Sequence, residues 1–115
     1  MIAEGCIITH ANIDRAVIGI RSVIENGTSI RNSVLMGADF YQNEDPRPVP
    51  GRAPLGIGVR CVIEGAIIDK NAHIGDDVVI SPSGKPENVD GDNYFIRDGV
   101  VVVPKGAVIP AGTKI

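Results

Sequence analysis

An aliphatic residue recurs every five or six positions along most of this chain, and a small residue usually stands two positions before it. Neither the 3.6-residue period of an α-helix nor the two-residue period of a long strand produces such a spacing. A separation of two places both residues of a pair on one face of a short strand. The thirteen pairs of this pattern are Gly5/Ile7, Ala11/Ile13, Ala16/Ile18, Ser22/Ile24, Thr28/Ile30, Ser33/Leu35, Cys61/Ile63, Ala66/Ile68, Ala72/Ile74, Val78/Ile80, Val101/Val103, Ala107/Ile109 and Thr113/Ile115.

The repeat predicts short strands joined by tight corners, with three strands closing one triangular coil of roughly 18 residues. Successive coils then stack through parallel strand pairing. We therefore expect an all-β fold, a single-stranded parallel β-helix of about four to five coils that covers residues 1–115 as one domain. The chain has no Trp and only two Phe and two Tyr. Its core must therefore consist of Ile, Val, Leu and Ala, which suit narrow packed layers.

Two other folds fit the sequence less well. A sandwich of antiparallel strands would show alternation over longer segments and hairpin turns. A helix over residues 6–18, which lack Gly and Pro, would place Ile7, Ala11 and Ile18 on one face, but the β-branched residues there disfavour it. The residues do not determine the handedness of the β-helix, because right-handed crossovers are the general rule.

Two segments interrupt the repeat. Residues 36–56 contain the aromatic pair Phe40-Tyr41 and four prolines, which central strands exclude. Residues 81–93 are polar and rich in turn-forming residues. We expect both segments to be loops that leave the coils, and loops of this length are often functional or contact a partner. Tyr94-Phe95 would then re-enter the structure.

Charge and cysteine content argue against several functional classes. The net charge is −3, and Lys and Arg form no run that would bind nucleic acid. No segment resembles a membrane span or a secretory signal, so we expect a cytoplasmic protein that binds no membrane. Cys6 and Cys61 stand in apolar runs and are expected to be buried free thiols. Asn26-Gly27-Thr28 is interpreted as a tight turn rather than a glycosylation site.

The residues form no recognisable catalytic constellation. His10 and His73 each stand outside an inward pair, which favours a solvated position, although a histidine general base between subunits would suit the acyl transfer common among hexapeptide-repeat proteins. Two histidines and two core-facing cysteines do not supply a zinc site, so no metal is expected. Residues 56–60 are glycine-rich but lack the spacing of a phosphate-binding loop, and we expect a corner there.

Two lysines remain as candidates for a binding site. Lys70 and Lys105 each stand at an expected corner, thirty-five positions apart, with the 81–93 loop between them. Without that loop their separation is roughly one coil, so the two ammonium groups would stand near one another on the same edge. Such a pair suits a phosphate or carboxylate ligand, and two unrelated surface charges are the alternative.

Several segments resemble, in the same order, those of ADP-glucose pyrophosphorylase (glucose-1-phosphate adenylyltransferase). The match covers nearly the whole chain, and MGAD followed by two aromatic residues and the later IIDKNA are its most specific parts. The departures fall in the proline-rich residues 42–56 and in the short 81–93 segment. The resembling segments are Gly19-Ile-Arg21-Ser22, Met36-Gly-Ala-Asp-Phe-Tyr-Gln-Asn-Glu44, Pro54-Leu-Gly-Ile-Gly58, Ala66-Ile-Ile-Asp-Lys-Asn-Ala-His-Ile-Gly75, Tyr94-Phe-Ile-Arg-Asp-Gly-Val-Val-Val103 and Pro104-Lys105-Gly-Ala-Val-Ile109 onward.

The resemblance implies a left-handed β-helix. In that family the full enzyme joins glucose 1-phosphate and ATP to give ADP-glucose and pyrophosphate, for glycogen or starch synthesis. Catalysis, with Mg²⁺ and ATP, belongs to an N-terminal nucleotidyltransferase domain, while the β-helix serves assembly and forms part of an effector site between the two domains. By residue match, Lys70 and Lys105 would contact the phosphorylated metabolite that acts as effector, with Asp69 beside them.

The resemblance thus implies a regulatory and oligomerisation domain that is not catalytic alone and holds no cofactor of its own. Its expected partners are the catalytic domain, the effector and further copies of the chain. A trimeric hexapeptide-repeat acyltransferase and a purely structural assembly module are the alternatives. The start of the chain inside the family pattern suggests excision from a longer protein, which would expose a strand edge at the first coil and predicts self-association there.

Overall fold

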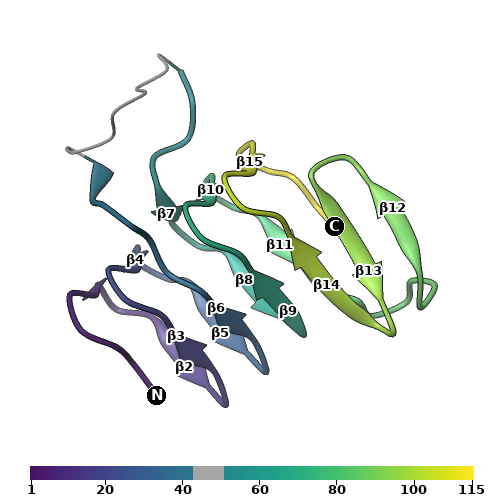
Figure 1. Cartoon of the computed structure of the whole chain (residues 1–115), viewed down its shortest axis with the longest axis horizontal. Coiled ribbons are helices and arrows are strands. Elements are labelled where there is room, and N and C mark those ends of the chain that lie inside the picture. Colours follow the sequence, from purple (N-terminus) through teal and green to yellow (C-terminus); the bar gives the residue numbers. More distant parts are fainter. Residues whose placement is uncertain (43–50) are drawn as a thin grey trace.

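The computed structural model describes residues 1–42 and 51–115. The chain winds into a parallel β-helix in which each side of the coil contributes strands to one of three sheets (Figure 1). The first sheet contains β1 (Ile7–Ile8), β4 (Val23–Ile24), β7 (Gly56–Ile57), β10 (His73–Ile74) and β15 (Val108–Ile109). The second contains β2 (Asn12–Asp14), β5 (Ser29–Arg31), β8 (Val62–Glu64) and β11 (Val79–Ile80). The third contains β3 (Val17–Ile18), β6 (Val34–Leu35), β9 (Ala66–Ile68), β14 (Val100–Val103), β13 (Tyr94–Arg97) and β12 (Val89–Gly91).

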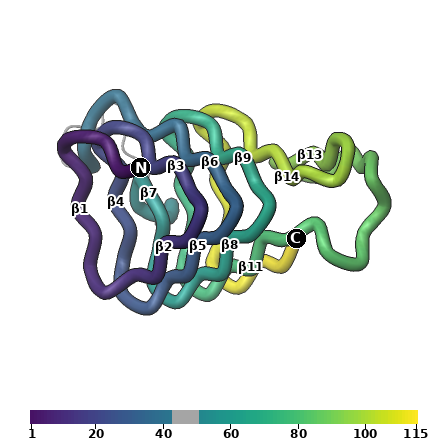
Figure 2. Tube along the Cα trace, turned by 90° about the horizontal axis from the view of Figure 1, so that it is seen from below, coloured from purple at the N-terminus to yellow at the C-terminus, as the bar shows by residue number. Residues whose placement is uncertain are grey.

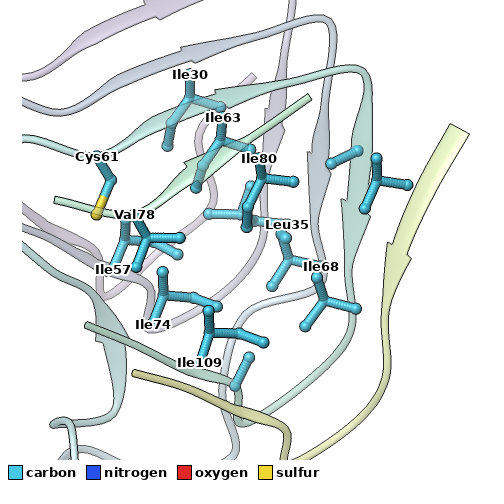
Figure 3. Close-up of a cluster of buried hydrophobic side chains, with 14 of the residues drawn as sticks. Ile30, Leu35, Ile57, Cys61, Ile63, Ile68, Ile74, Val78, Ile80 and Ile109 are labelled. Carbon is cyan, nitrogen blue, oxygen red and sulfur yellow. The ribbon is translucent and has the colours of Figure 1, made fainter. Parts of the chain in front are cut away.

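Strand pairing stacks the aliphatic residue of each coil directly on that of the next. The coils follow one another in chain order along the axis (Figure 2), and their inward side chains meet in one core (Figure 3). Most of these residues are buried, because a coil on either side covers them. The inward rows are Ile8, Ile24, Ile57, Ile74 and Ile109 in the first sheet, Ile13, Ile30, Ile63 and Ile80 in the second, and Ile18, Leu35, Ile68 and Val103 in the third. The expected β-helix is confirmed.

The first predicted pair is wrong by one position. Ile7 is 55% exposed, whereas Cys6 and Ile8 pack against the core. The register shows the reason, since Ile8 rather than Ile7 lies opposite the fully buried Ile24. Two adjacent isoleucines satisfied the spacing rule equally well, and a preceding glycine favoured the wrong one.

The upper boundary of the predicted loop 36–56 is also wrong. Leu55 and Ile57 are buried and form a further inward pair, and Gly56–Ile57 is strand β7, which pairs with β4 and β10. This pair escaped the pattern because leucine, rather than a small residue, stands at its first position. The part of the loop at residues 43–50 lies outside the described residues.

The predicted loop 81–93 contains a strand. β12 pairs antiparallel with β13, and β13 pairs antiparallel with β14, so residues 89–97 form a hairpin that widens the third sheet. Asp92-Asn93 makes the turn, with Asn93 at a φ of 59°. Tyr94-Phe95 thus re-enters through this hairpin, which projects beyond the coils (Figure 2). Strand β12 (Val-Asp-Gly) is short and has a single aliphatic residue, so it gave no signal of its own.

Candidate functional site

The corner between the third and first sheets, here called the site corner, brings Lys70 and Lys105 onto successive coils. The amide of Gly106 donates to the carbonyl oxygen of Lys70 at 2.9 Å, so the two lysines occupy equivalent places one coil apart. Strands of neighbouring coils lie roughly 4.8 Å apart, which puts the two side chains within reach of one small ligand. The residue after each lysine, Asn71 or Gly106, has a positive φ of 62° or 71°, a backbone conformation that Gly and Asn adopt most readily.

Asp39 lies in the same corner and contacts Lys70 directly. Its Oδ1 atom is 3.2 Å from Lys70 Nζ. Its Oδ2 atom accepts a hydrogen bond from Asn71 Nδ2 at 3.0 Å, and its amide donates to Asn71 Oδ1 at 2.9 Å. The Asn71 amide, the Lys70 ammonium and the charge of Lys105 hold the pKa of the Asp39 carboxyl below its usual value, so this carboxylate is ionised at neutral pH.

Asp69 holds the turn that presents Lys70. Its Oδ1 atom accepts a hydrogen bond from the backbone amide of Lys70 at 2.7 Å. Asp69 also lines a cavity of about 30 Å³ together with Arg21, Leu55 and Ala72. That volume holds a water molecule but no metabolite, so a ligand of the site corner would bind on its surface.

The MGAD segment is fitted tightly to the preceding coil. Gly37 has a φ of 93°, and a Cβ atom there would stand 2.3 Å from the carbonyl oxygen of Ile20. Further along, the Tyr41 hydroxyl donates to the carbonyl oxygen of Gly5 at 2.8 Å, and Gln42 Oε1 accepts from the amide of Leu55 at 2.6 Å. These contacts position Asp39 between the earlier coils and Lys70.

Asp39 and Asn71 were not among the residues singled out from the sequence. Asn71 carried a signal, because an asparagine after a corner lysine suits a positive φ. Asp39 stood inside the resembling MGAD segment, but nothing in the spacing relates it to a lysine 31 positions later. Closed coils bring the two together, and only the fold reveals that contact.

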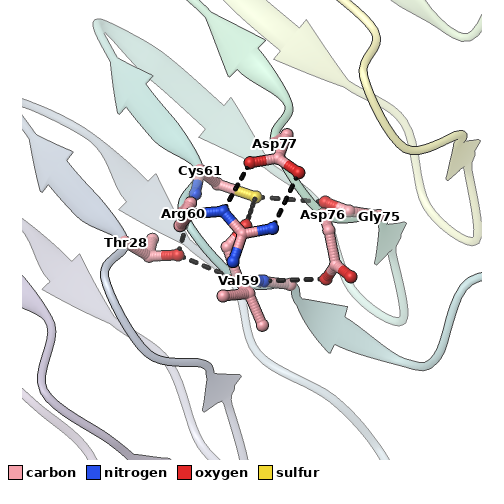
Figure 4. Close-up of polar contacts among 8 residues, drawn as sticks. Thr28, Val59, Arg60, Cys61, Gly75, Asp76 and Asp77 are labelled. Atoms are coloured by element: carbon pink, nitrogen blue, oxygen red, sulfur yellow. Dashed lines mark hydrogen bonds and ion pairs between the residues drawn. The ribbon is translucent and has the colours of Figure 1, made fainter.

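A second polar cluster, at the corner between the first and second sheets, has a structural role (Figure 4). Arg60 forms a bidentate ion pair with Asp77, at 2.8 and 3.0 Å. Thr28 Oγ1 accepts from the Cys61 amide at 3.1 Å and donates to the carbonyl oxygen of Gly58 at 2.7 Å. The Thr28 bonds satisfy buried polar groups between coils, whereas the Arg60–Asp77 pair is exposed and links two coils at the surface.

The predicted Asn26-Gly27-Thr28 turn is confirmed, and the prediction of two buried free thiols is correct for Cys61 and only partly so for Cys6. Both cysteines are free, but Cys61 is fully buried whereas Cys6 is half-buried. Burial raises the pKa of the Cys61 thiol, so this group stays protonated and is no nucleophile at neutral pH. Gly27 takes a φ of 80° in the turn that ends at buried Thr28.

The prediction of a solvated position is correct for His10 and wrong for His73. His10 is exposed at a corner of the first coil, with a φ of 44°. His73 points away from the core, yet it is only 5% exposed because the returning insertion covers it. Its Nδ1 atom is 2.9 Å from the carbonyl oxygen of Ala53. The two histidines therefore lie three coils apart and form no joint site.

The outer face of the third sheet carries a row of apolar side chains, here called the apolar row. Val17, Val34, Ile67, Val102 and Phe95 lie opposite one another in consecutive strands. Val17, Ile67 and Phe95 are 44%, 38% and 37% exposed. A contiguous exposed row of this kind is typical of a surface that contacts a protein.

Metal-ligand clusters and membrane-spanning helices are both missing from residues 1–42 and 51–115. No group of three or more His, Cys, Asp or Glu side chains is arranged to hold a metal ion. No helix there has the length and apolar character needed to cross a bilayer.

Comparison with known proteins identifies the family. Residues 1–114 match the GLGC left-handed parallel β-helix domain. The whole chain aligns with the chloroplastic/amyloplastic glucose-1-phosphate adenylyltransferase small subunit of Triticum aestivum, at 42% identity over 120 residues, and spans 25% of its length. The parallel sheets described above agree with this match. The chain is therefore a left-handed parallel β-helix and belongs to the GLGC family of β-helix domains of ADP-glucose pyrophosphorylase.

Proposed function

We propose that this chain is the regulatory and oligomerisation domain of a glucose-1-phosphate adenylyltransferase and has no catalytic activity alone. Its site corner would supply half of an anionic effector site, with a catalytic domain supplying the other half. ATP, Mg²⁺ and glucose 1-phosphate would then bind to that catalytic domain. The observation that carries the proposal is the stacking of Lys70 and Lys105 on successive coils, in a chain that is 42% identical to a small subunit of this enzyme.

The geometry of the corner suits a phosphorylated metabolite. Lys70 and Lys105 offer two ammonium groups to the several oxygens of a phosphate, and Asp69 holds the Lys70 turn through its backbone amide. An effector that bridges two domains favours one relative arrangement of them, with a coupling free energy of about 1–3 kcal/mol. Alone, the exposed corner would bind such a ligand weakly.

Assembly is the second part of the proposal, and the apolar row supports it. Removing this row from water by contact with a second copy would contribute favourable free energy in proportion to its apolar area. A charged residue substituted in the middle of the row should therefore weaken association.

The effector half-site can be tested on the chain itself. We expect 3-phosphoglycerate, titrated at constant ionic strength, to shift the NMR signals of Lys70 and Lys105. Lys70→Gln and Lys105→Gln should each weaken binding by up to about fivefold, because each removes one exposed charge contact. Lys114→Gln removes the same charge outside the corner, next to β11, and should leave binding unchanged. Equal losses in all three variants would contradict the proposed site.

Assembly and catalysis need separate measurements. In sedimentation equilibrium, Ile67→Lys should shift the chain toward monomer, whereas Val62→Lys, on the second sheet and similarly exposed at 44%, should not. A wild-type chain that stays monomeric at all concentrations would count against the assembly role. Production of ADP-glucose from ATP and glucose 1-phosphate by the purified chain would refute the non-catalytic role.

A further inference from the structure

Of the two lysines in the proposed half-site, Lys70 already has an anionic partner within the chain. The Asp39 carboxylate stands 3.2 Å from Lys70 Nζ, and the two side chains are 44% and 41% exposed. The contact is therefore an exposed ion pair that a solute anion can reach. A phosphate oxygen that binds Lys70 would have to stand beside this carboxylate or displace it.

The carboxylate is held in this position rather than placed there by a flexible side chain. Asn71 binds both the carboxylate and the backbone amide of Asp39, at 3.0 and 2.9 Å. Asn71 is itself anchored, because its amide donates to the carbonyl oxygen of Gly37 at 3.1 Å. The short side chain of Asp39 therefore cannot swing far from Lys70 without breaking these bonds.

The charges of the corner determine whether Asp39 strengthens or weakens anion binding. Lys70 and Lys105 attract an incoming anion, while Asp39 repels it and competes for the Lys70 ammonium. In the described part of the chain, Lys105 forms no ion pair with a carboxylate, although its charge acts on Asp39. Asp39 thus removes part of the positive potential from one of the two lysines and leaves the other exposed.

We propose that Asp39 is an affinity-setting residue of the site corner, a built-in anion that competes for Lys70 with a phosphate group bound across Lys70 and Lys105. This inference rests on the proposed effector half-site and adds to it a residue that lowers affinity. It predicts that neutralising Asp39 strengthens phosphate binding, the opposite of what a positioning role predicts. If Asp39 served only to hold Lys70 in place, its neutralisation would weaken binding.

The test is a titration of the chain with inorganic phosphate against chloride at constant ionic strength, followed by the NMR signals of Lys70 and Lys105. Asp39→Asn removes the charge but keeps an oxygen and an N–H group for the pair with Asn71. We expect it to tighten phosphate binding about two- to fivefold, the range for one exposed charge contact. Asp39→Glu keeps the charge and should not tighten binding.

Asp77→Asn is the matched control, because it makes the same change in an exposed ion pair, with Arg60, at another corner. Tighter binding by Asp39→Asn alone, or binding seen only in that variant, supports the inference. Weaker or unchanged binding overturns it while leaving the half-site intact. Equal tightening by Asp77→Asn also overturns it, since net charge would then be the cause. Absence of phosphate binding at both lysines in the wild type and in every variant overturns the half-site as well. If Asp39→Asn does not fold, Asp39→Ala carries the same expectation.

Discussion

Gly37 packs against the backbone of Ile20 with no room for a Cβ atom, so replacing it with alanine should destabilise the fold. Gly37→Ala introduces two costs. The first is the positive φ of 93°, which an L-residue with a Cβ adopts at a cost of about 1–2 kcal/mol. The second is steric, because the Cβ atom would stand 2.3 Å from the oxygen and 2.8 Å from the nitrogen of Ile20. Both atoms belong to backbone, so a side-chain rotation cannot relieve the clash.

The steric cost can be separated by comparison with Gly106→Ala. Gly106 stands one position after the place that is equivalent to Gly37 in a later coil. It also has a positive φ, of 71°, but a Cβ atom there would meet nothing within 4 Å. Both variants share the φ penalty and the loss of unfolded-state entropy. Overpacking typically adds about 1–3 kcal/mol, and displacing Gly37 also strains its hydrogen bond from the Asn71 amide, worth about 1 kcal/mol. We therefore expect Gly37→Ala to lower the free energy of unfolding by about 2 kcal/mol more than Gly106→Ala does.

Urea denaturation followed by circular dichroism measures this difference. With a slope of about 1–3 kcal/mol per molar urea for a small domain, the unfolding midpoints of the two variants should differ by about 1 M. Equal midpoints would refute the reasoning, because they would show that the Gly37–Ile20 contact relaxes at no cost. A folded Gly37→Ala chain should also show altered NMR signals at Asp39, which follows Gly37 by two residues.

Three further predictions test the core, the ion pairs and the buried thiol. Ile63→Ala should lower the free energy of unfolding by about 2–5 kcal/mol, whereas Ile7→Ala, at a 55% exposed position, should change it by about 0.5 kcal/mol or less; similar urea midpoints would contradict the corrected register. Arg60 lowers the pKa of Asp77 from 3.8, so the Asp77 carboxylate stabilises the fold above that pH and loses its effect as the pH falls through the lowered pKa. The difference in melting temperature between the wild type and Asp77→Asn should accordingly be larger at pH 6 than at pH 2, and a constant difference would exclude this ion pair as its source. Cys61 is fully buried, so iodoacetamide should label it, as followed by mass spectrometry, only at the rate of unfolding; rapid labelling in native buffer would show that the second sheet opens.

Most of the coiled architecture can be predicted from the sequence, because the inward positions repeat in a closed geometry. Each aliphatic residue has to fill the same central space, so the spacing identifies Ile30, Ile63 and Ile80 as inward residues, and the structure stacks them in one row. The pattern fails where two neighbours satisfy it equally, as at Ile7 and Ile8. It also fails at Leu55, where a large residue occupies the position that is small elsewhere.

The insertions obey no repeat, and their contacts could not be predicted. The covering of His73 depends on where Ala53 lies after the chain has left and rejoined the coils. The hairpin at residues 89–97 depends on the free edge of β14, with which β13 pairs. These contacts are set by tertiary packing, which overrides local propensity in short strands.

The candidate site shows the same division between what the repeat determines and what it leaves open. Corner residues are free of the packing that governs inward positions, so charges can stand there at no cost to the core. Residues at equivalent positions of successive coils lie above one another, so Lys70 and Lys105 are neighbours although an insertion separates them in the sequence. Whether two residues can bind one anion at that corner therefore depends on their positions within the coil and not on their separation in the sequence. By the same reasoning, Asp39 acts on Lys70 because the chain completes one coil between them. The direction in which Asp39→Asn changes phosphate affinity therefore tests the fold and the site together.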